Sequence, residues 1–433
     1  MRCLRPENRL VFTSPLPHKT VMHSPRKQPK LGNLELTVMM AAVMALNALA
    51  IDAMLPAFPR MTAGLGLIDP NRIQFVITAY LLGMGAGSLV HGPLSDRYGR
   101  RPILLGAIAG YIVCALACSF ATSFDMLIAM RIAQGLCGAG LGVLVTSIIR
   151  DQFEGDAMAR RMSTIFLVFM AVPIVAPLVG SVVLIFAGWR SIFDLIAIMA
   201  VAVLAWVVLR LPETLDPENI VPIKAKTLTA SWKQVISDRT ANCYMIAGAT
   251  AQGALFGYLN SSQQIFERTF SAPDFFPIGF AIIAIGIACA NFTNARIVER
   301  FGARRVSQTA LIAFIFIATS QALAAIFAPA SLPLFLVLIT ANMAMIGFVG
   351  SNFSSIAMQP FGAIAGTASS FQNFVRTIWA AFIGAIIGQQ FNGAVTPVAL
   401  GFLACGLTAF TLILYGERGK LFTRPGTTKH LPM

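Results

Sequence analysis

Three ionisable residues, Asp52, Arg131 and Arg376, stand inside long apolar stretches of the chain. A charge at the centre of a bilayer costs at least about 2.5–3.5 kcal/mol, so a charged side chain retained there indicates a function or a specific partner. Asp52 lies about six residues from the outer end of the first stretch, and Arg131 about five from the outer end of the fourth. At about 1.5 Å per residue, both lie roughly 7–9 Å below the outer boundary.

A buried acid and an arginine at matching depth can exchange a proton for a substrate, because the environment tunes the acid's proton affinity. We therefore expect Asp52 to be the protonation site and Arg131 to modulate it. The alternative is a structural ion pair that fixes helix packing. Arg376, with Gln372 and Asn373, is expected to be the only strongly polar cluster in the spans of the second half. It either faces a substrate cavity or hydrogen-bonds backbone carbonyls.

The elements that must position these residues are membrane-spanning helices. The chain has 433 residues, 57% of them hydrophobic and 12% charged, with a mean hydropathy of +0.75. A soluble domain has about 25% charged residues, so a water-soluble globular enzyme and a disordered chain are both excluded. Twelve stretches are long enough to span a bilayer. They run near 35–58, 73–95, 103–122, 126–149, 162–187, 192–210, 241–262, 276–297, 307–327, 333–357, 365–390 and 393–415.

These stretches predict an all-α polytopic membrane protein with two six-helix bundles, at 35–210 and 241–415. A polar, proline-containing linker joins them at 211–240. Residues 1–34 form a basic tail without the apolar core of a signal peptide, and we expect it to be disordered. Residues 416–433 form a second tail. The seven cysteines lie mostly inside spans and include no CxxC pair, which predicts no metal site.

The net charge of +14 follows the predicted topology. Of the 32 Lys and Arg residues, 26 fall on the side that holds both termini, four fall in loops on the other side, and two lie within spans. By the positive-inside rule, both termini are cytoplasmic. Topology and attraction to anionic lipid therefore explain the excess positive charge without nucleic acid.

An internal repeat relates the two bundles. The segment GPLSDRYGRRP at 92–102 follows the second span, and NARIVERFGARR at 294–305 follows the eighth. Aligning Asp96 with Glu299 also aligns an arginine, an aromatic residue and a glycine, while the later arginine pairs are one residue out of step. Parallel repeats of this kind build a large class of secondary transporters, with substrate handled between the halves.

The motifs resemble those of the major facilitator superfamily, and in particular its Bcr/CflA-type drug:proton antiporters. GPLSDRYGRR resembles the superfamily's loop signature, RIAQG at 131–135 its helix-4 signature, and LNALAIDAMLPAFP at 46–59 the helix-1 signature of its drug-efflux branch. LPETL at 211–215 is typical of the Bcr/CflA type. The resemblance covers residues 35 to 415. It implies that helices 1 and 4 line a central cavity. The candidate substrate contacts in that cavity are Gln134, Gln372, Asn373 and Arg376.

The resemblance also implies a gate at the cytoplasmic end. Asp96 would face the N-terminus of helix 11, where a carboxylate gains about 0.3–1 kcal/mol, and Arg100 would pair with Asp151. The alternative for Asp96 is a solvated loop charge. The candidate gating residues are Gly92, Asp96, Arg97, Gly99, Arg100, Asp151 and Glu299.

In helix 5, Pro173, Pro177 and Gly180 match part of the family's antiporter signature and predict a kink, although two of its glycines are replaced. We expect proton-coupled efflux of small amphipathic drugs across the inner (plasma) membrane. We expect the transporter to be a monomer that is driven by the proton gradient and needs no cofactor. The alternative is an exporter or importer of a specific metabolite. An intramembrane enzyme is not expected, because no GxSxG motif or intramembrane catalytic pair is present.

Overall fold

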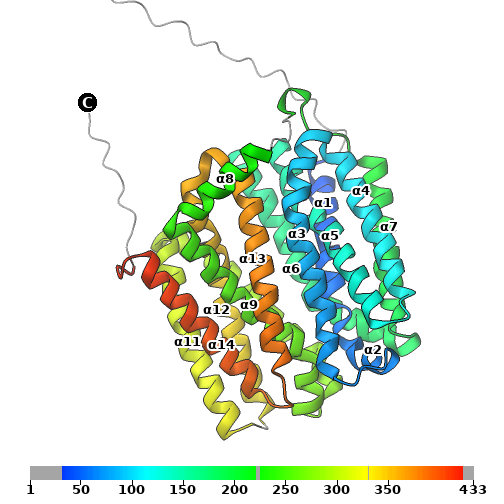
Figure 1. Ribbon diagram of the computed structural model, residues 1–433, viewed down its shortest axis with the longest axis vertical. Coiled ribbons are helices and arrows are strands. Elements are labelled where there is room, and N and C mark those ends of the chain that lie inside the picture. The colour runs from blue at the N-terminus through cyan, green and yellow to red at the C-terminus, as the bar shows by residue number, and fades with distance from the viewer. Residues whose placement is uncertain (1–31, 221–224, 330, 423–433) are drawn as a thin grey trace, which may run out of the picture.

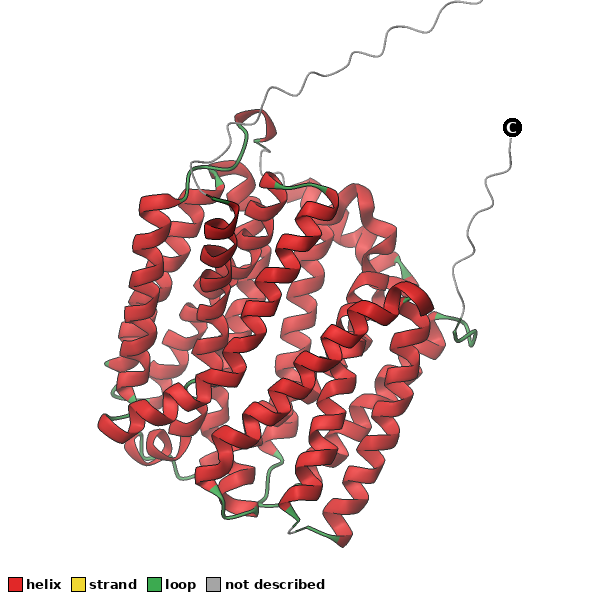
Figure 2. Ribbon diagram, turned by 180° about the vertical axis from the view of Figure 1, so that it is seen from behind, coloured by secondary structure: helices red, strands yellow, loops and turns green. Residues whose placement is uncertain are grey.

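The computed structural model describes residues 32–220, 225–329 and 331–422, and within them every regular element is a helix (Figures 1 and 2). Of the predicted tails, residues 1–31 and 423–433 lie outside the described residues, whereas 32–34 and 416–422 are described. The helices of the first half are α1 (Asn33–Asp52), α2 (Phe58–Gly64), α3 (Phe75–Tyr98), α4 (Arg100–Ser119), α5 (Phe124–Gln152), α6 (Gly155–Phe186) and α7 (Arg190–Arg210).

The second half repeats this succession of long helices. It contains α9 (Arg239–Gln264), α10 (Phe276–Phe301), α11 (Ala303–Phe327), α12 (Leu332–Met358), α13 (Ala365–Gln389) and α14 (Thr396–Gly416). Between the halves, within the predicted linker 211–240, lies the helix α8 (Ala225–Ser237). Side chains cap the N-termini of several helices. At the start of α9, for example, the Asp238 carboxylate accepts a hydrogen bond from the backbone N–H of Ala241.

The twelve predicted spans correspond to twelve long helices, of which the first is broken near its end. After Asp52, α1 passes through a short 3₁₀ turn at Leu55–Ala57 into α2, where Pro56 and Pro59 occupy first-turn positions. Eleven of the described helical segments are long and apolar enough to cross a membrane by length and composition. The twelfth, α9, has 26 residues and packs among α12, α13 and α14, but it is too polar to satisfy the same criterion.

The polarity of α9 corrects one expectation. The run Asn260-Ser261-Ser262-Gln263-Gln264 forms the last turns of this helix and is buried throughout. The cluster around Arg376 is therefore not the only strongly polar one in the helices of the second half. A polar run at the end of an apolar stretch has the composition of a loop, so hydropathy gives no sign that it remains helical and buried.

The two ends of the bundle differ in their connections. We call the end that holds the α3–α4 and α10–α11 connections the basic end, because Arg100 and Arg304 lie there in the first turns of α4 and α11. The helix α8 lies at this end, at the top of Figure 1. The other end, where α2 lies, is the opposite end. The repeat predicted from the sequence is present in the backbone. Gly99 (φ 99°, ψ 154°) and Gly302 (φ 85°, ψ 147°) adopt the same left-handed conformation between paired helices.

The halves meet mainly where α3 packs antiparallel to α13, and where α6 packs against α10. Three close approaches define the first contact. A Cβ at Gly388 would lie 2.2 Å from Gln74 Oε1, one at Gly85 would lie 2.8 Å from Ile378 Cδ1, and one at Gly92 would lie 3.2 Å from Ser370 Oγ. Paired residue numbers along this contact sum to about 462, so α3 and α13 stay together from one end of the bundle to the other.

Candidate functional site

Arg131 lies in α5 at the centre of the first half and is fully buried. Its Nε donates to the Val76 carbonyl (3.1 Å), Nη2 to the Ala50 carbonyl (3.1 Å) and Nη1 to Gln134 Oε1 (2.7 Å). The guanidinium carbon also lies 4.4 Å from the centre of the Tyr80 ring. Neutral acceptors from α1, α3 and α5 therefore surround this cation.

Asp52, the last residue of α1, is 5% exposed, and its carboxylate forms no hydrogen bond or ion pair with the described residues. The two predicted coupling residues are therefore neighbours without being paired, since Arg131 binds the carbonyl two residues before Asp52. The structural ion pair considered as the alternative is not formed here. Gly180 of α6 brings its helix against this turn, because a Cβ at position 180 would lie 1.9 Å from the Ala53 carbonyl oxygen.

A polar chain links Arg131 to the middle of α1. The Tyr80 hydroxyl beneath the guanidinium donates to Asn47 Oδ1 (2.5 Å), and Asn47 Nδ2 donates to the Gly138 carbonyl (3.0 Å). The Tyr111 hydroxyl donates to the Leu46 carbonyl (2.8 Å). Tyr80, Asn47 and Tyr111 were not singled out from the sequence. The sequence feature that could have identified them is a tyrosine or amide side chain at the same depth in the membrane as a buried charge.

Gln134 was expected to contact substrate, but here it is fully buried and accepts the Arg131 hydrogen bond. The other candidate cavity residues lie in α13. Gln372 donates to the Ala357 carbonyl (2.9 Å), and Arg376 Nη2 donates to Asn373 Oδ1 (3.1 Å). Arg376 Nε is buried without a hydrogen-bond partner, and no described acid pairs with this guanidinium.

At the basic end, Arg100 is 4% exposed and joins two acids. Its Nε lies 2.8 Å from Asp151 Oδ2, as predicted, and its Nη1 contacts Asp96 Oδ1 and Ser95 Oγ. By the register of α3 and α13, Asp96 lies level with the first turn of α13. Its ion pair, however, is with Arg100 of its own half.

Glu213, from the LPETL segment, is a structural partner that the sequence motif did not reveal. Its carboxylate accepts hydrogen bonds from the backbone N–H groups of Arg100 (2.9 Å) and Arg101 (3.1 Å), which begin α4. It thus caps a helix N-terminus, where a carboxylate is favoured. Gly99 is required beside it, because a Cβ there would lie 2.6 Å from Glu213 Oε2.

The remaining predicted gating residues have weaker surroundings. Arg97 is exposed, with its guanidinium over the Tyr98 ring, and Gly92 faces Ser370 of the other half. Glu299, the repeat partner of Asp96, is exposed and forms no ion pair with described residues. In the second half the ion pair is instead Arg304 to Glu417, at 2.7 Å.

Pro173, Pro177 and Gly180 lie inside α6, which is helical from Gly155 to Phe186. The two prolines remove two backbone donors without ending the helix. The predicted kink stays a prediction, while the close approach of Gly180 to α1 is a feature of the packing.

At the opposite end, amide side chains join the two halves. Asn71 Nδ2 donates to the Phe391 carbonyl (2.8 Å) and to the Gln389 carbonyl (3.4 Å). In return, Gln389 Nε2 donates to the Asn71 carbonyl (2.8 Å) and to Gln74 Oε1 (3.3 Å).

A second pair of amides completes this contact. Gln74 Nε2 donates to Gln264 Oε1 (2.7 Å), and Gln264 Nε2 donates to the Pro70 carbonyl (3.1 Å). We call Asn71, Gln74, Gln264 and Gln389 the amide clamp. It closes the α2–α3 side of the first half against α9 and α13. The sequence alone does not reveal the clamp, because single amides in four separate segments form no motif.

Comparison with known proteins agrees with this architecture. A family model described as Major Facilitator Superfamily matches residues 40–385. The chain is 29% identical over 363 residues to a bicyclomycin resistance protein homolog of Haemophilus influenzae, covering 82% of this chain and 89% of the relative. It is 28% identical over 386 residues to a chloramphenicol resistance protein of Pseudomonas aeruginosa, covering 86% and 84%.

Solved structures give the same fold at low identity. The D-xylose-proton symporter superposes with a TM-score of 0.67 at 13% identity, covering 89% of this chain and 99% of that one. The human organic anion transporter MFSD10 superposes with a TM-score of 0.62 at 16% identity, covering 89% and 100%. With the family model matching most of its length, the chain is a multi-pass membrane protein and a secondary transporter, not an enzyme, and it belongs to the major facilitator superfamily.

Proposed function

We propose that this transporter exports small amphipathic drugs in exchange for protons, and that the basic end is cytoplasmic. The observation that carries the proposal is the unpaired, buried Asp52 carboxylate beside the fully buried Arg131. The names of the relatives, which include bicyclomycin and chloramphenicol resistance proteins, support a drug-like substrate. The excess of Lys and Arg at the basic end supports the orientation.

The contacts of Arg131 suggest how proton and substrate are coupled. Its charge is compensated by carbonyl and amide oxygens, so no acid neutralises it directly. A deprotonated Asp52 is attracted to this cation, and a protonated one is not. Protonation therefore alters the force between α1 and α5, and a substrate that engages either group competes with the proton.

In this mechanism each half moves as a unit around the site. Arg100, Asp151 and Glu213 tie α4, α5 and the segment after α7 together at the basic end. Asp96 is suited to latch that end against α13. The amide clamp closes the opposite end, so the two ends can open alternately. A monomer contains every part of this device; small molecules, protons and the surrounding lipid are its partners.

The test is a drug susceptibility and accumulation screen in an efflux-deficient host, comparing wild type with Asp52→Asn. We expect the variant to lose efflux driven by a pH gradient, because Asn cannot carry the proton, while purified protein still binds drug. Asp194→Asn, which removes a half-buried acid in α7, is the matched control and should keep efflux.

Wild-type efflux by Asp52→Asn at equal expression would contradict the assignment of the proton site. Flux of a radiolabelled compound that ignores the pH gradient in the wild type would instead favour a uniporter or a transporter of a specific metabolite. The two results separate the residue assignment from the coupling itself.

A further inference from the structure

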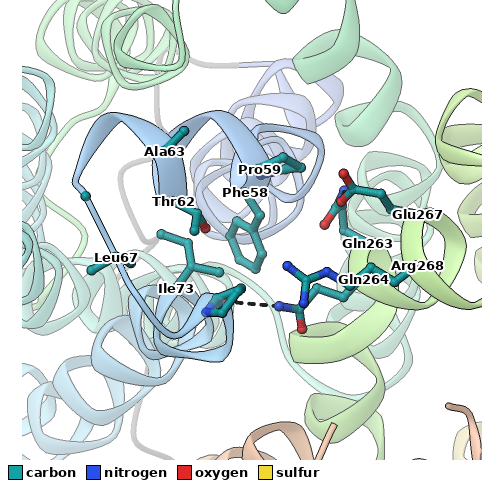
Figure 3. Close-up of a pocket in the computed structure, with 12 residues that line it drawn as sticks. Phe58, Pro59, Thr62, Ala63, Leu67, Ile73, Gln263, Gln264, Glu267 and Arg268 are labelled. Atoms are coloured by element: carbon teal, nitrogen blue, oxygen red, sulfur yellow. Dashed lines mark hydrogen bonds between the residues drawn. The ribbon is translucent and has the colours of Figure 1, made fainter. Parts of the chain in front are cut away.

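A cavity of about 240 Å³ lies between the two halves at the opposite end (Figure 3). Phe58, Thr62 and Ile73 line it from the first half, and Gln263, Glu267 and Arg268 line it from the second. It is adjacent to the amide clamp, because Gln264 of the clamp lines the cavity together with Pro70, whose carbonyl accepts the Gln264 hydrogen bond. Asp52 and Arg131 do not line it, so it is separate from the coupling site.

The two walls differ in chemistry. The wall from the first half is mostly apolar and includes the Phe58 ring, which Figure 3 shows facing the polar side chains of the other wall. On that wall, Gln263 Nε2 donates to Glu267 Oε2 (2.8 Å), which leaves Oε1 for a ligand. The Arg268 guanidinium is exposed and forms no hydrogen bond or ion pair with described residues.

The backbone holds this acid and this base at the cavity. After Gln264 the helix continues as a π-helical turn, Ile265–Thr269, a conformation that is rare and found frequently at functional sites. Phe266 anchors the turn, since it is fully buried against Phe276 and Phe335. With Phe266 packed into the second half, Glu267 and Arg268 reach the boundary between the halves.

We propose that this cavity is a second ligand site, which binds small zwitterionic aromatic compounds and holds the opposite end closed. The ring would pack against Phe58, the ammonium group would bind Glu267, and the carboxylate would bind Arg268. The volume lies below the about 300–1,000 Å³ of typical drug-sized sites, which limits the ligand to one or two rings. Because both halves supply the walls, the site exists only while they are together.

A ligand that binds only the closed form must favour it, by a factor of 1 + [L]/Kd. Such a compound, added on the side of the membrane that the opposite end faces, therefore acts as an inhibitor of transport and not as a substrate. This consequence rests on the alternating opening described under the proposed function. The binding itself does not, and it is measured without a proton gradient.

The binding test uses three probes with the same ring: phenylalanine, phenethylamine and 3-phenylpropionate, titrated into purified protein in lipid nanodiscs by calorimetry. Phenylalanine should bind most tightly. Glu267→Gln should weaken binding of phenylalanine and phenethylamine about threefold to tenfold and spare 3-phenylpropionate. Arg268→Gln should weaken phenylalanine and 3-phenylpropionate by a similar factor and spare phenethylamine. Asp274→Asn, an exposed acid just beyond the π-helical turn, is the matched control and should change nothing.

The closure test uses spin labels at Asp69→Cys and Asn392→Cys, one in each half, in a background with the seven native cysteines replaced. In a variant whose amide clamp is weakened by Asn71→Ala and Gln389→Ala, phenylalanine at ten times its Kd should raise the ratio of short to long distances between the labels about elevenfold. Equal binding of the three probes, or binding unaffected by both charge substitutions, would overturn the site. If the three probes bind in the expected order but the label distances do not change, the ligand does not hold the opposite end closed. That result would leave the proposal of efflux through the coupling site unaffected.

Discussion

At the scale of single residues, burial without a charged partner distinguishes the centre of the first half. Asp52 and Arg131 were predicted from their depth alone, because a rare charge in an apolar stretch is conspicuous. Their partners were not predictable. Arg131 binds the backbone carbonyls of Val76 and Ala50, and every residue has a carbonyl, so no side-chain pattern marks the ones that are used. Glu213 was part of a recognised motif, but only the fold brings it to the start of α4.

Arg131→Lys should abolish transport while the protein still folds. A lysine ammonium keeps the charge but lacks the planar fork that reaches three acceptors on three helices, and it cannot stack on Tyr80 in the same way. The measurement is drug accumulation together with the thermal unfolding temperature of the purified variant. Arg190→Lys is the matched control, since Arg190 donates to the Ala121 carbonyl at the opposite end, away from the site. Full activity of Arg131→Lys would show that charge alone is sufficient.

At the scale of helices, hydropathy and turn residues were sufficient to place most span boundaries within a few residues. The boundaries of several helices, however, differ by more. The predicted first span, 35–58, divides into α1, a 3₁₀ turn and the start of α2, because proline at positions 56 and 59 favours new helix starts. The predicted fifth span, 162–187, begins seven residues earlier as α6. Polar residues at a membrane surface can remain helical, and hydropathy does not detect them.

Gly180→Ala should destabilise the first half by about 1–3 kcal/mol, since the added methyl group would meet the Ala53 carbonyl oxygen at 1.9 Å. The backbone of α1 beside Asp52 would have to shift, so efflux should fall as well. Thermal unfolding in detergent measures the first effect. Gly106→Ala in α4 is the control: nothing lies within 4 Å of its added Cβ, and stability should hold or rise slightly. Equal behaviour of the two variants would contradict the close approach of α6 to α1.

At the scale of the whole molecule, the repeat and the twelve helices made the two-bundle architecture predictable, whereas the contacts between the bundles were not. The α3–α13 contact and the amide clamp join residues far apart in the sequence, from 190 positions for Gln74 and Gln264 to 318 for Asn71 and Gln389. Such pairs form only when the two folded bundles pack together. A single sequence, without an alignment of relatives, has no local pattern from which these contacts could be predicted.

Combining Asn71→Ala with Gln389→Ala should favour opening at the opposite end. The substitutions remove four hydrogen bonds between the halves, each worth about 0.5–1.5 kcal/mol. Labelling of a cysteine introduced at Ile73 by a membrane-impermeant maleimide should become faster. Asn392→Ala is the control, because the Asn392 side chain only accepts a hydrogen bond from the nearby Ala394 N–H. Unchanged labelling in the double variant would mean that other contacts hold this end closed.

The composition of the amide clamp has an electrical consequence. Asn71, Gln74, Gln264 and Gln389 carry no formal charge, so separating them moves no charge through the membrane field. A transmembrane voltage performs about 2.3 kcal/mol of work per elementary charge per 100 mV, and on a neutral gate that work is zero. Voltage therefore acts on the cycle only where charge resides, as at Asp52, Arg131, Arg376 and any charged substrate. The amide clamp therefore closes the opposite end through contacts that the membrane potential neither tightens nor loosens.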